Sequence, residues 1–106
     1  MKSDLQNIKN IFTSMSEDSW NTNENLKWGY FFYDKNKNKL EKLLEILSQE
    51  GFELNVLHKT ELGDWKLNIQ KIETITPEVL HKRNLRFNKL AESFSIELYD
   101  GWDVEK

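Results

Sequence analysis

The fold is decided by residues 27–33, KWGYFFY, and by the leucine-rich helix pattern that follows them. Residues 27–33 are rich in aromatic side chains and lack helical spacing, which predicts a strand. Side chains alternate along a strand. We therefore expect Trp28, Tyr30 and Phe32 on one face of a sheet, and Phe31 and Tyr33 on the other.

A helix is predicted directly after this strand. Leucines at 40, 43, 44 and 47 have the i, i+3, i+4, i+7 spacing of an apolar helix stripe. Asp34 is the expected N-cap, and Gly51 supplies the left-handed backbone that ends many helices.

The rest of the chain alternates between strand and helix patterns. Residues 52–59 and 65–70 show the apolar–polar alternation of half-buried strands, with a turn at residues 62–64. Thr76 and Pro77 predict a helix start, and its buried stripe is expected at Leu80, Phe87, Leu90, Ala91 and Phe94. A short last strand follows, in which Ile96 and Leu98 alternate with Glu97 and Tyr99 and which breaks at Asp100-Gly101.

The resulting order, β-α-β-β-α-β, predicts a ferredoxin-like α+β domain with a four-stranded antiparallel sheet and two helices on one face. Upstream, residues 3–15 have helical spacing, with Ser3 or Asp4 as the cap, and residues 16–25 are polar and turn-rich. We expect residues 1–25 to form an N-terminal helix and linker, and residues 26–106 to form the domain.

Composition narrows the functional classes. The 106 residues contain no cysteine, which excludes disulfides, thiolate metal sites and cysteine nucleophiles. The net charge of −3 argues against strong non-specific nucleic-acid binding. No stretch reaches the ~20 apolar residues of a membrane span, and the first 13 residues lack the apolar run of a signal peptide. A cytoplasmic protein is expected.

No group of residues has the pattern of an active site. His58 and His81 are far apart in the sequence and lack a third ligand, so neither a metal site nor a cofactor is expected. The chain has neither a glycine-rich phosphate loop nor a nucleophile elbow. We expect a protein that is not an enzyme.

Two surface features leave alternatives open. Lys35, Lys37, Lys39 and Lys42 crowd the start of the first domain helix, either as ordinary surface charge or as a patch for an acidic partner. Aromatic residues on a four-stranded sheet are also found in RNA-recognition domains. RNA-recognition domains also need aromatic residues on the third strand, adjacent to the first. RNA binding is disfavoured because the polar face of that strand offers Lys66, Asn68 and Gln70, and because the net charge is acidic.

The C-terminal sequence Tyr99-Asp100-Gly101-Trp102 allows two interpretations that are not exclusive. Asp-Gly is a turn pair, so Tyr99 and Trp102 are expected to fold back and close the core, with Asp100 capping the turn. The same residues, with Trp28, are the candidate partner-binding residues, because tyrosine and tryptophan are favoured at protein interfaces.

These residues resemble the RraB family, the regulators of ribonuclease E activity B. The resemblance covers about residues 26–106 and is strongest from Leu90-Ala91-Glu92-Ser93-Phe94 to the Tyr-Asp-Gly-Trp signature. It implies a ferredoxin-like domain that binds ribonuclease E and lowers its activity without being a catalyst. The distance from Phe94 to Tyr99 is one residue longer than in the best-known members, which predicts a β-bulge in the last strand.

We therefore predict a protein-binding regulator, an inhibitor of a ribonuclease E-type enzyme, with no cofactor, no membrane contact and no direct nucleic-acid binding. The first alternative is an oligomeric or small-ligand-binding module, with a homodimer formed through the open sheet face at Phe31 and Tyr33. The second alternative is an RNA-binding module.

Overall fold

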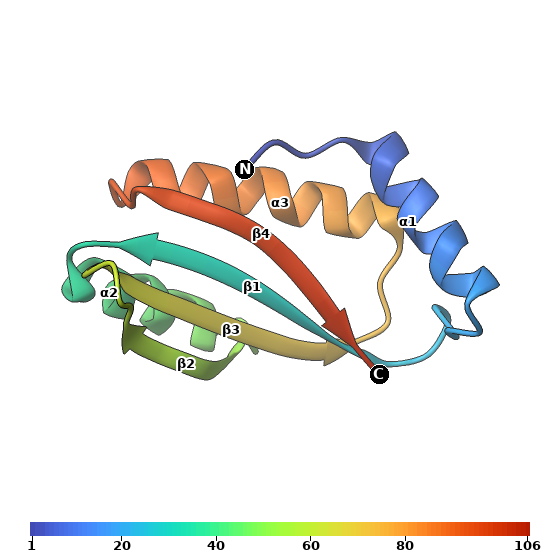
Figure 1. Cartoon of the computed structure of the whole chain (residues 1–106), viewed down its shortest axis with the longest axis horizontal. Helices are drawn as coiled ribbons and strands as arrows, with labels where there is room; N and C mark the ends of the chain where they lie inside the picture. Colours follow the sequence, from blue (N-terminus) through green and yellow to red (C-terminus); the bar gives the residue numbers. More distant parts are fainter.

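The computed structural model describes all residues from Met1 to Lys106. Its elements are α1 (Leu5–Glu17), β1 (Leu26–Asp34), α2 (Lys37–Ser48), β2 (Glu53–Lys59), β3 (Trp65–Glu73), α3 (Pro77–Ser93) and β4 (Leu98–Glu105), as Figure 1 shows. The chain is thus α+β, and the predicted order of strands and helices is confirmed. None of the helices combines the length and apolar character needed to cross a bilayer.

The sheet is open, and all neighbouring strands are antiparallel, in the order β2-β3-β1-β4. Strand β1 lies between β3 and β4, while β2 and β4 form the two edges. Each edge strand contains one register shift. The shift in β2 lies at Asn55, and the shift in β4 lies at Asp100.

One face of the sheet is covered by α2 and α3 (Figure 1). The predicted alternation along β1 is confirmed, because Trp28, Tyr30 and Phe32 are buried on this face whereas Phe31 and Tyr33 are half-buried on the other. The helices and β3 complete the core with Leu40, Leu43, Leu47, Leu67, Ile69, Leu80, Phe87 and Ala91. Burial of these large apolar side chains is the main favourable term in folding.

The N-terminal helix shares this core. Asp4 caps α1 by accepting a hydrogen bond from the Gln6 backbone amide at 2.9 Å. The ring of Phe12 stacks on Trp28, with 5.6 Å between ring centroids, and Ile8 and Met15 are buried beside it. Helix α1 also packs against α3. A boundary between residues 1–25 and the domain stays a prediction, although the two parts have one continuous core.

The start of α2 differs from the prediction. Asn36 is the N-cap of α2, and its side chain accepts a hydrogen bond from the Asn38 amide at 2.9 Å. Asp34 instead ends β1 as a buried residue, and its carboxylate accepts hydrogen bonds from the Asn36 amide at 2.7 Å and the Glu97 amide at 2.9 Å. The expectation of an Asp34 cap is wrong because this carboxylate joins the end of β1 to the loop before β4.

Helix α3 begins as predicted, with Thr76 as N-cap and Pro77 at the first helical position. The buried stripe differs in one respect. Leu90 and Phe94 are only half-buried, whereas Asn84 is completely buried. Asn84 was not expected in the core, and its role is to pair with the hydroxyl of Tyr99.

The last strand does not break at Asp100-Gly101, so this expectation is wrong. Strand β4 continues through the pair to Glu105, with a bulge at Asp100. Gly101 has a φ of 107°, which glycine adopts at little cost. The alternation predicted for this strand placed Leu98 toward the core and Tyr99 away from it. The structure shows the reverse, since Tyr99 is buried and Leu98 is 42% exposed. The last strand contains a bulge, but it lies at Asp100 and not between Phe94 and Tyr99, where the extra residue led us to expect it. Residues 94–97 form the end of α3 and the loop before β4.

Candidate functional site

The four residues predicted to bind a partner lie at different depths. Trp28 and Tyr99 are 1% and 2% exposed, so both are part of the core. Trp102 is half-buried and lies against Trp28, with 5.7 Å between ring centroids. Asp100 is exposed. A partner that meets the protein in this form therefore reaches Asp100 and the outer part of Trp102, but neither Trp28 nor Tyr99.

Tyr99 is fixed in the core by both its ring and its hydroxyl. The hydroxyl donates a hydrogen bond to Asn84 Oδ1 at 2.7 Å. The ring packs against Phe32 and edge-on against Phe87, at centroid distances of 4.8 and 5.6 Å. Burial raises the pKa of Tyr99 far above its ordinary value. These contacts agree with the interpretation that Tyr99 closes the core.

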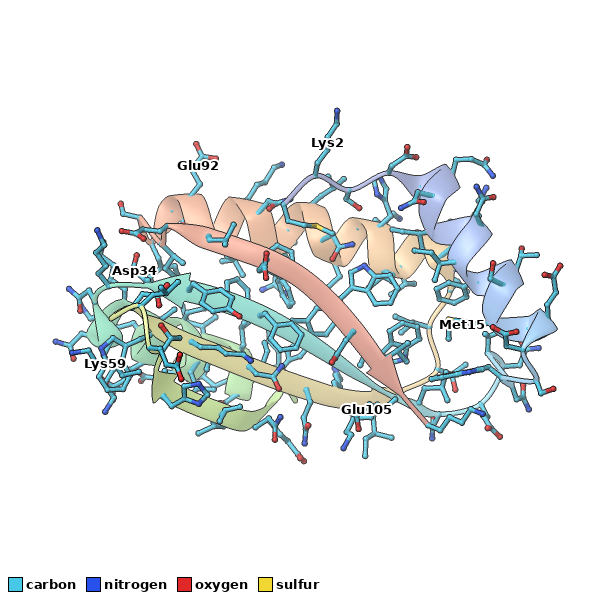
Figure 2. All side chains as sticks on the ribbon, in the orientation of Figure 1. Lys2, Met15, Asp34, Lys59, Glu92 and Glu105 are labelled. Carbon is cyan, nitrogen blue, oxygen red and sulfur yellow. The ribbon has the colours of Figure 1, made fainter.

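The sheet face opposite α2 and α3 carries no helix, and we refer to it as the open face. Its apolar residues are the half-buried Phe31 and Tyr33 of β1 and Val56 of β2, with Leu98 and Ile72 exposed by 42% and 66% at opposite ends. The register places charged and polar side chains around them: Lys27, Glu53, Asn55, His58, Lys66, Asn68, Gln70, Asp103 and Glu105. In Figure 2, Glu105 marks the end of β4 at the edge of this surface.

Asn68 organises the middle of the open face. Its Nδ2 atom donates hydrogen bonds to the carbonyl oxygens of Tyr30 at 3.0 Å and Ile69 at 3.3 Å. Its Oδ1 atom accepts a hydrogen bond from Asn55 Nδ2 at 2.6 Å. Asn68 therefore connects β1, β3 and the bulge of β2. The sequence signal for this role was a single polar residue between apolar neighbours of a strand.

Gly29 creates a notch in the open face. A Cβ atom at this position would collide with the Asp103 carboxylate and would lie 3.3 Å from Asn68 Nδ2. Gly29 and Asp103 are cross-strand partners in β1 and β4. The carboxylate thus occupies the space that a side chain at residue 29 would need. Burial, followed by the nearby charge of Glu105, raises the pKa of Asp103.

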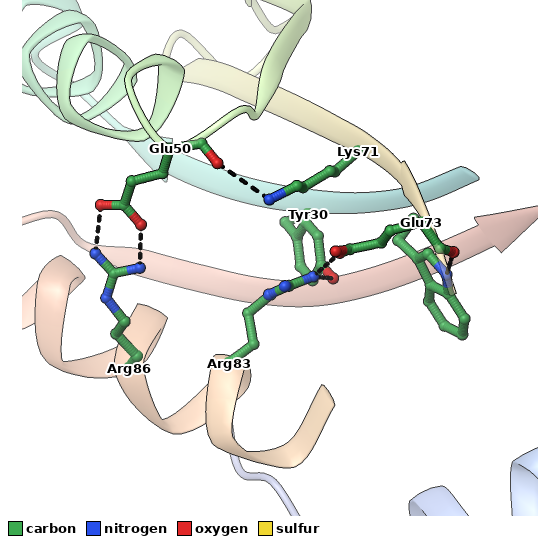
Figure 3. A network of polar contacts seen from close by, with 7 residues as sticks. Tyr30, Glu50, Lys71, Glu73, Arg83 and Arg86 are labelled. Atoms are coloured by element: carbon green, nitrogen blue, oxygen red, sulfur yellow. Dashed lines mark hydrogen bonds and ion pairs between the residues drawn. The ribbon is translucent and has the colours of Figure 1, made fainter. Parts of the chain in front are cut away.

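A polar network on the opposite, helix-covered face is shown in Figure 3. Arg83 donates hydrogen bonds to the Tyr30 hydroxyl at 2.9 Å and to Glu73, whereas Arg86 pairs with both oxygens of Glu50 at 2.5 and 2.6 Å. Burial raises the pKa of Tyr30 to about 12, although Arg83 opposes the shift. Each charged group has a partner within the network, which therefore joins α3 to β3 and to the end of α2.

The lysines at the start of α2 line an open hollow of about 460 Å³ whose lining has no hydrophobic residue. Lys35 lies 4.0 Å from Glu97, and Lys39 lies 3.9 Å from Asp34, so acids offset part of the positive charge.

The two histidines belong to different elements, His58 to β2 and His81 to α3. His81 Nδ1 and the Ser3 hydroxyl form a hydrogen bond of 2.8 Å. The structure contains no group of three or more His, Asp or Glu side chains able to hold a metal ion.

Comparison with known proteins identifies a relationship over nearly the whole chain. The family described as RraB, Regulator of ribonuclease activity B, matches residues 6–104. The match begins within α1 and ends within β4, so it includes the N-terminal helix as well as the sheet. No individually curated protein matches the chain.

Proposed function

The chain belongs to the RraB family of regulators of ribonuclease activity, and from this we propose that it binds a ribonuclease E-type enzyme and lowers its rate of RNA cleavage. The observation that carries the proposal is the family match, which extends from α1 to β4. In this role the protein is a cytoplasmic, non-catalytic regulator that contacts the enzyme and not its RNA substrate.

The arrangement of the elements supports a ferredoxin-like fold for this regulator. The chain order β-α-β-β-α-β and the sheet order β2-β3-β1-β4 both agree with the split β-α-β arrangement of that fold. In this arrangement one sheet face is free of helices. A fold of this kind serves many functions, so the function is argued from the surface rather than from the fold.

The signature segment presents two of its residues at the surface, on different faces of the sheet. Asp100 is exposed in the bulge of β4, and Phe31 and Tyr33 supply aromatic surface on the open face. Trp102 is the cross-strand partner of Tyr30 and lies half-buried against Trp28 on the helix-covered face. The charge of Asp100 helps raise the pKa of Tyr33, after the larger effect of burial, which indicates that the two side chains are close. Aromatic residues beside charged ones are typical of protein interfaces. We propose that the ribonuclease contacts Asp100 and this aromatic surface, and reaches the outer part of Trp102 around the edge strand β4.

The test uses the purified ribonuclease of the source organism with a fluorescent single-stranded RNA. Increasing amounts of the chain are expected to slow cleavage to a plateau, whereas the chain mixed with RNA alone gives no complex in a gel-shift assay. Asp100→Lys is expected to weaken inhibition. Its matched control is Glu92→Lys, at an exposed residue that projects from α3 away from the sheet (Figure 2). Cleavage that stays unchanged at saturating chain would overturn the proposal.

A second candidate function is self-association through the open face. The observation that favours it is the exposure of Ile72 and Leu98, whose apolar surface lies on the same face as Phe31 and Tyr33. Dimers bury apolar patches of this kind. Analytical ultracentrifugation distinguishes the two candidate functions. A wild-type protein with the mass of a dimer, and a Leu98→Lys variant with the mass of a monomer, would support self-association. A wild-type monomer at about 100 μM would exclude it.

A further inference from the structure

The half of the open face formed by β4 carries an excess of negative charge. Asp100, Asp103 and Glu105 are all exposed residues of this strand. Only Glu105 has an ion pair, with Lys27 at 3.3 Å. Asp100 and Asp103 form no ion pair with any residue of the chain. The β4 half of the open face is therefore complementary to positive charge.

The notch over Gly29 gives this charge a defined position. The glycine allows the Asp103 carboxylate to lie against the sheet, where no other residue donates a hydrogen bond to it. Lys66 and Lys27 act on this carboxylate from a distance and oppose the rise in its pKa, but neither forms an ion pair with it. A partly desolvated carboxylate without an ion pair gains from a cation placed beside it. The guanidinium of arginine suits such a position, because it is planar and donates two parallel hydrogen bonds to a carboxylate.

The neighbouring aromatic surface is also suited to cations. Phe31 follows Gly29 on the same face of β1, and Lys66 already places its Nζ atom 5.1 Å from the centre of the Phe31 ring. Cations are attracted to the faces of aromatic rings. The aliphatic stems of arginine and lysine can cover Phe31 and Tyr33 while their charged ends reach the acids.

We propose that the β4 half of the open face docks a basic segment of the protein partner, with one arginine side chain against the Asp103 carboxylate that fills the notch over Gly29. The proposal deepens the proposed function and rests on it for the partner being a protein. It adds the chemistry of the partner, which is an arginine- and lysine-rich segment with apolar residues between the charges. Asp103 and Gly29 are the residues that determine specificity.

The experiment uses a synthetic peptide, Arg-Leu-Arg-Leu-Arg with blocked ends, as the probe. Titration into the ¹⁵N-labelled full chain is expected to shift the amide signals of Gly29, Phe31 and Asp103 the most. Affinity is expected to fall as salt is raised, because the charges are near the surface. The peptide Glu-Leu-Glu-Leu-Glu is expected to cause no shifts at these residues.

Two variants of the chain test the notch separately. Asp103→Asn removes the charge and is expected to weaken binding of the arginine peptide about fivefold, the effect of a partly exposed ion pair. Gly29→Ala keeps every charge but displaces the carboxylate, and it is expected to weaken binding by a similar factor. Glu92→Gln, an exposed acid on α3, is the matched control and leaves the affinity unchanged. A circular dichroism melt of each variant shows that it is folded.

The outcomes separate this proposal from the proposed function. Peptide shifts that spread over all acidic surfaces, or equal affinities for Asp103→Asn and wild type, overturn the docking surface. If the ribonuclease is inhibited equally by wild type, Asp103→Asn and Gly29→Ala, the regulator function stands and this surface is wrong. If the peptide binds at the notch but the ribonuclease is not inhibited, the surface stands and the proposed function fails.

Discussion

The two faces of the sheet use neighbouring residues of the same strands for different purposes. On the helix-covered face, Trp28, Tyr30 and Phe32 are between 0 and 1% exposed. On the open face, Phe31 and Tyr33 are half-buried, and the glycine between Trp28 and Tyr30 leaves space for a carboxylate. The signature is divided in the same way, with Tyr99 inside and Asp100 outside. Stability and binding are therefore expected to respond to different substitutions, even one position apart.

The adjacent pair Phe32 and Phe31 tests this comparison most strongly. Phe32→Ala removes a buried ring that packs against Phe87 and Tyr99 and is expected to lower the free energy of unfolding by about 3–5 kcal/mol. Phe31→Ala removes a half-buried ring and is expected to cost on the order of 1 kcal/mol. Urea denaturation followed by tryptophan fluorescence measures both. Equal losses would show that the open face is as important for stability as the core.

The stability of the protein at alkaline pH is expected to depend on the buried Tyr30 of the helix-covered face more than on Tyr33 of the open face. The pKa of Tyr30 is raised to about 12 in the folded state, from an ordinary value of 10.0. The native state holds this proton more tightly than the unfolded chain. Its contribution to stability is therefore complete below pH 10 and is lost as the pH rises from 10 to 12, at about 1.4 kcal/mol per pH unit. Urea denaturation between pH 8 and 12 measures the decline.

The matched variants for the alkaline decline are Tyr30→Phe and Tyr33→Phe. Tyr30→Phe is expected to reduce the slope without abolishing it, because burial also raises the pKa of Tyr99. Tyr33→Phe, on the open face, leaves most of the slope. A slope that is the same in wild type and Tyr30→Phe would contradict the assignment of the decline to this buried hydroxyl.

The inner half of the signature is tested by Tyr99→Phe. The substitution removes the hydroxyl that donates to Asn84 Oδ1 and leaves a buried acceptor unpaired, at an expected cost of about 1–3 kcal/mol. Binding of the ribonuclease by the folded variant is expected to be unchanged. Thermal melting with an inhibition assay on the same sample measures both quantities. Lost inhibition at full stability would mean that Tyr99 reaches the partner.

A further effect on stability concerns the backbone of the bulge. Gly101→Ala places a side chain on a residue with a φ of 107° and is expected to cost about 1–2 kcal/mol. Gly63→Ala is the control, because Gly63 has a φ of 93° and a Cβ atom there meets no atom within 4 Å. A loss at Gly101 that exceeds the loss at Gly63 measures the contribution of the β4 bulge. Differential scanning calorimetry resolves the two values.

The sequence predicted the regular parts of the fold because their signals are local. The leucine spacing of α2, the Thr76-Pro77 start of α3 and the alternation along β1 depend on neighbouring residues, and all three predictions are correct. The errors involve long-range contacts. Asp34 looked like a helix cap, but its carboxylate bonds to the amide of Glu97, 63 residues away.

The candidate site was harder to predict for the same reason. Asp100-Gly101 reads as a turn in isolation, and only pairing with β1 makes it a bulge that turns Tyr99 inward and Leu98 outward. Gly29 and Asp103 are 74 positions apart, and neither has a distinctive pattern of its own. Their relationship arises from the register of β1 with β4, which a sequence without its pairing does not provide.

The irregularities at Asn55 in β2 and Asp100 in β4 have a consequence for behaviour in a crowded solution. An edge strand without a bulge exposes a regular row of unpaired N–H and C=O groups, to which a strand of another molecule can pair. Here both outer strands are interrupted, each beside a polar residue. Addition of strands from either side is thereby discouraged, and the sheet resists growth into fibrils. The protein is thus expected to remain free of aggregates while it leaves its open face uncovered for other molecules.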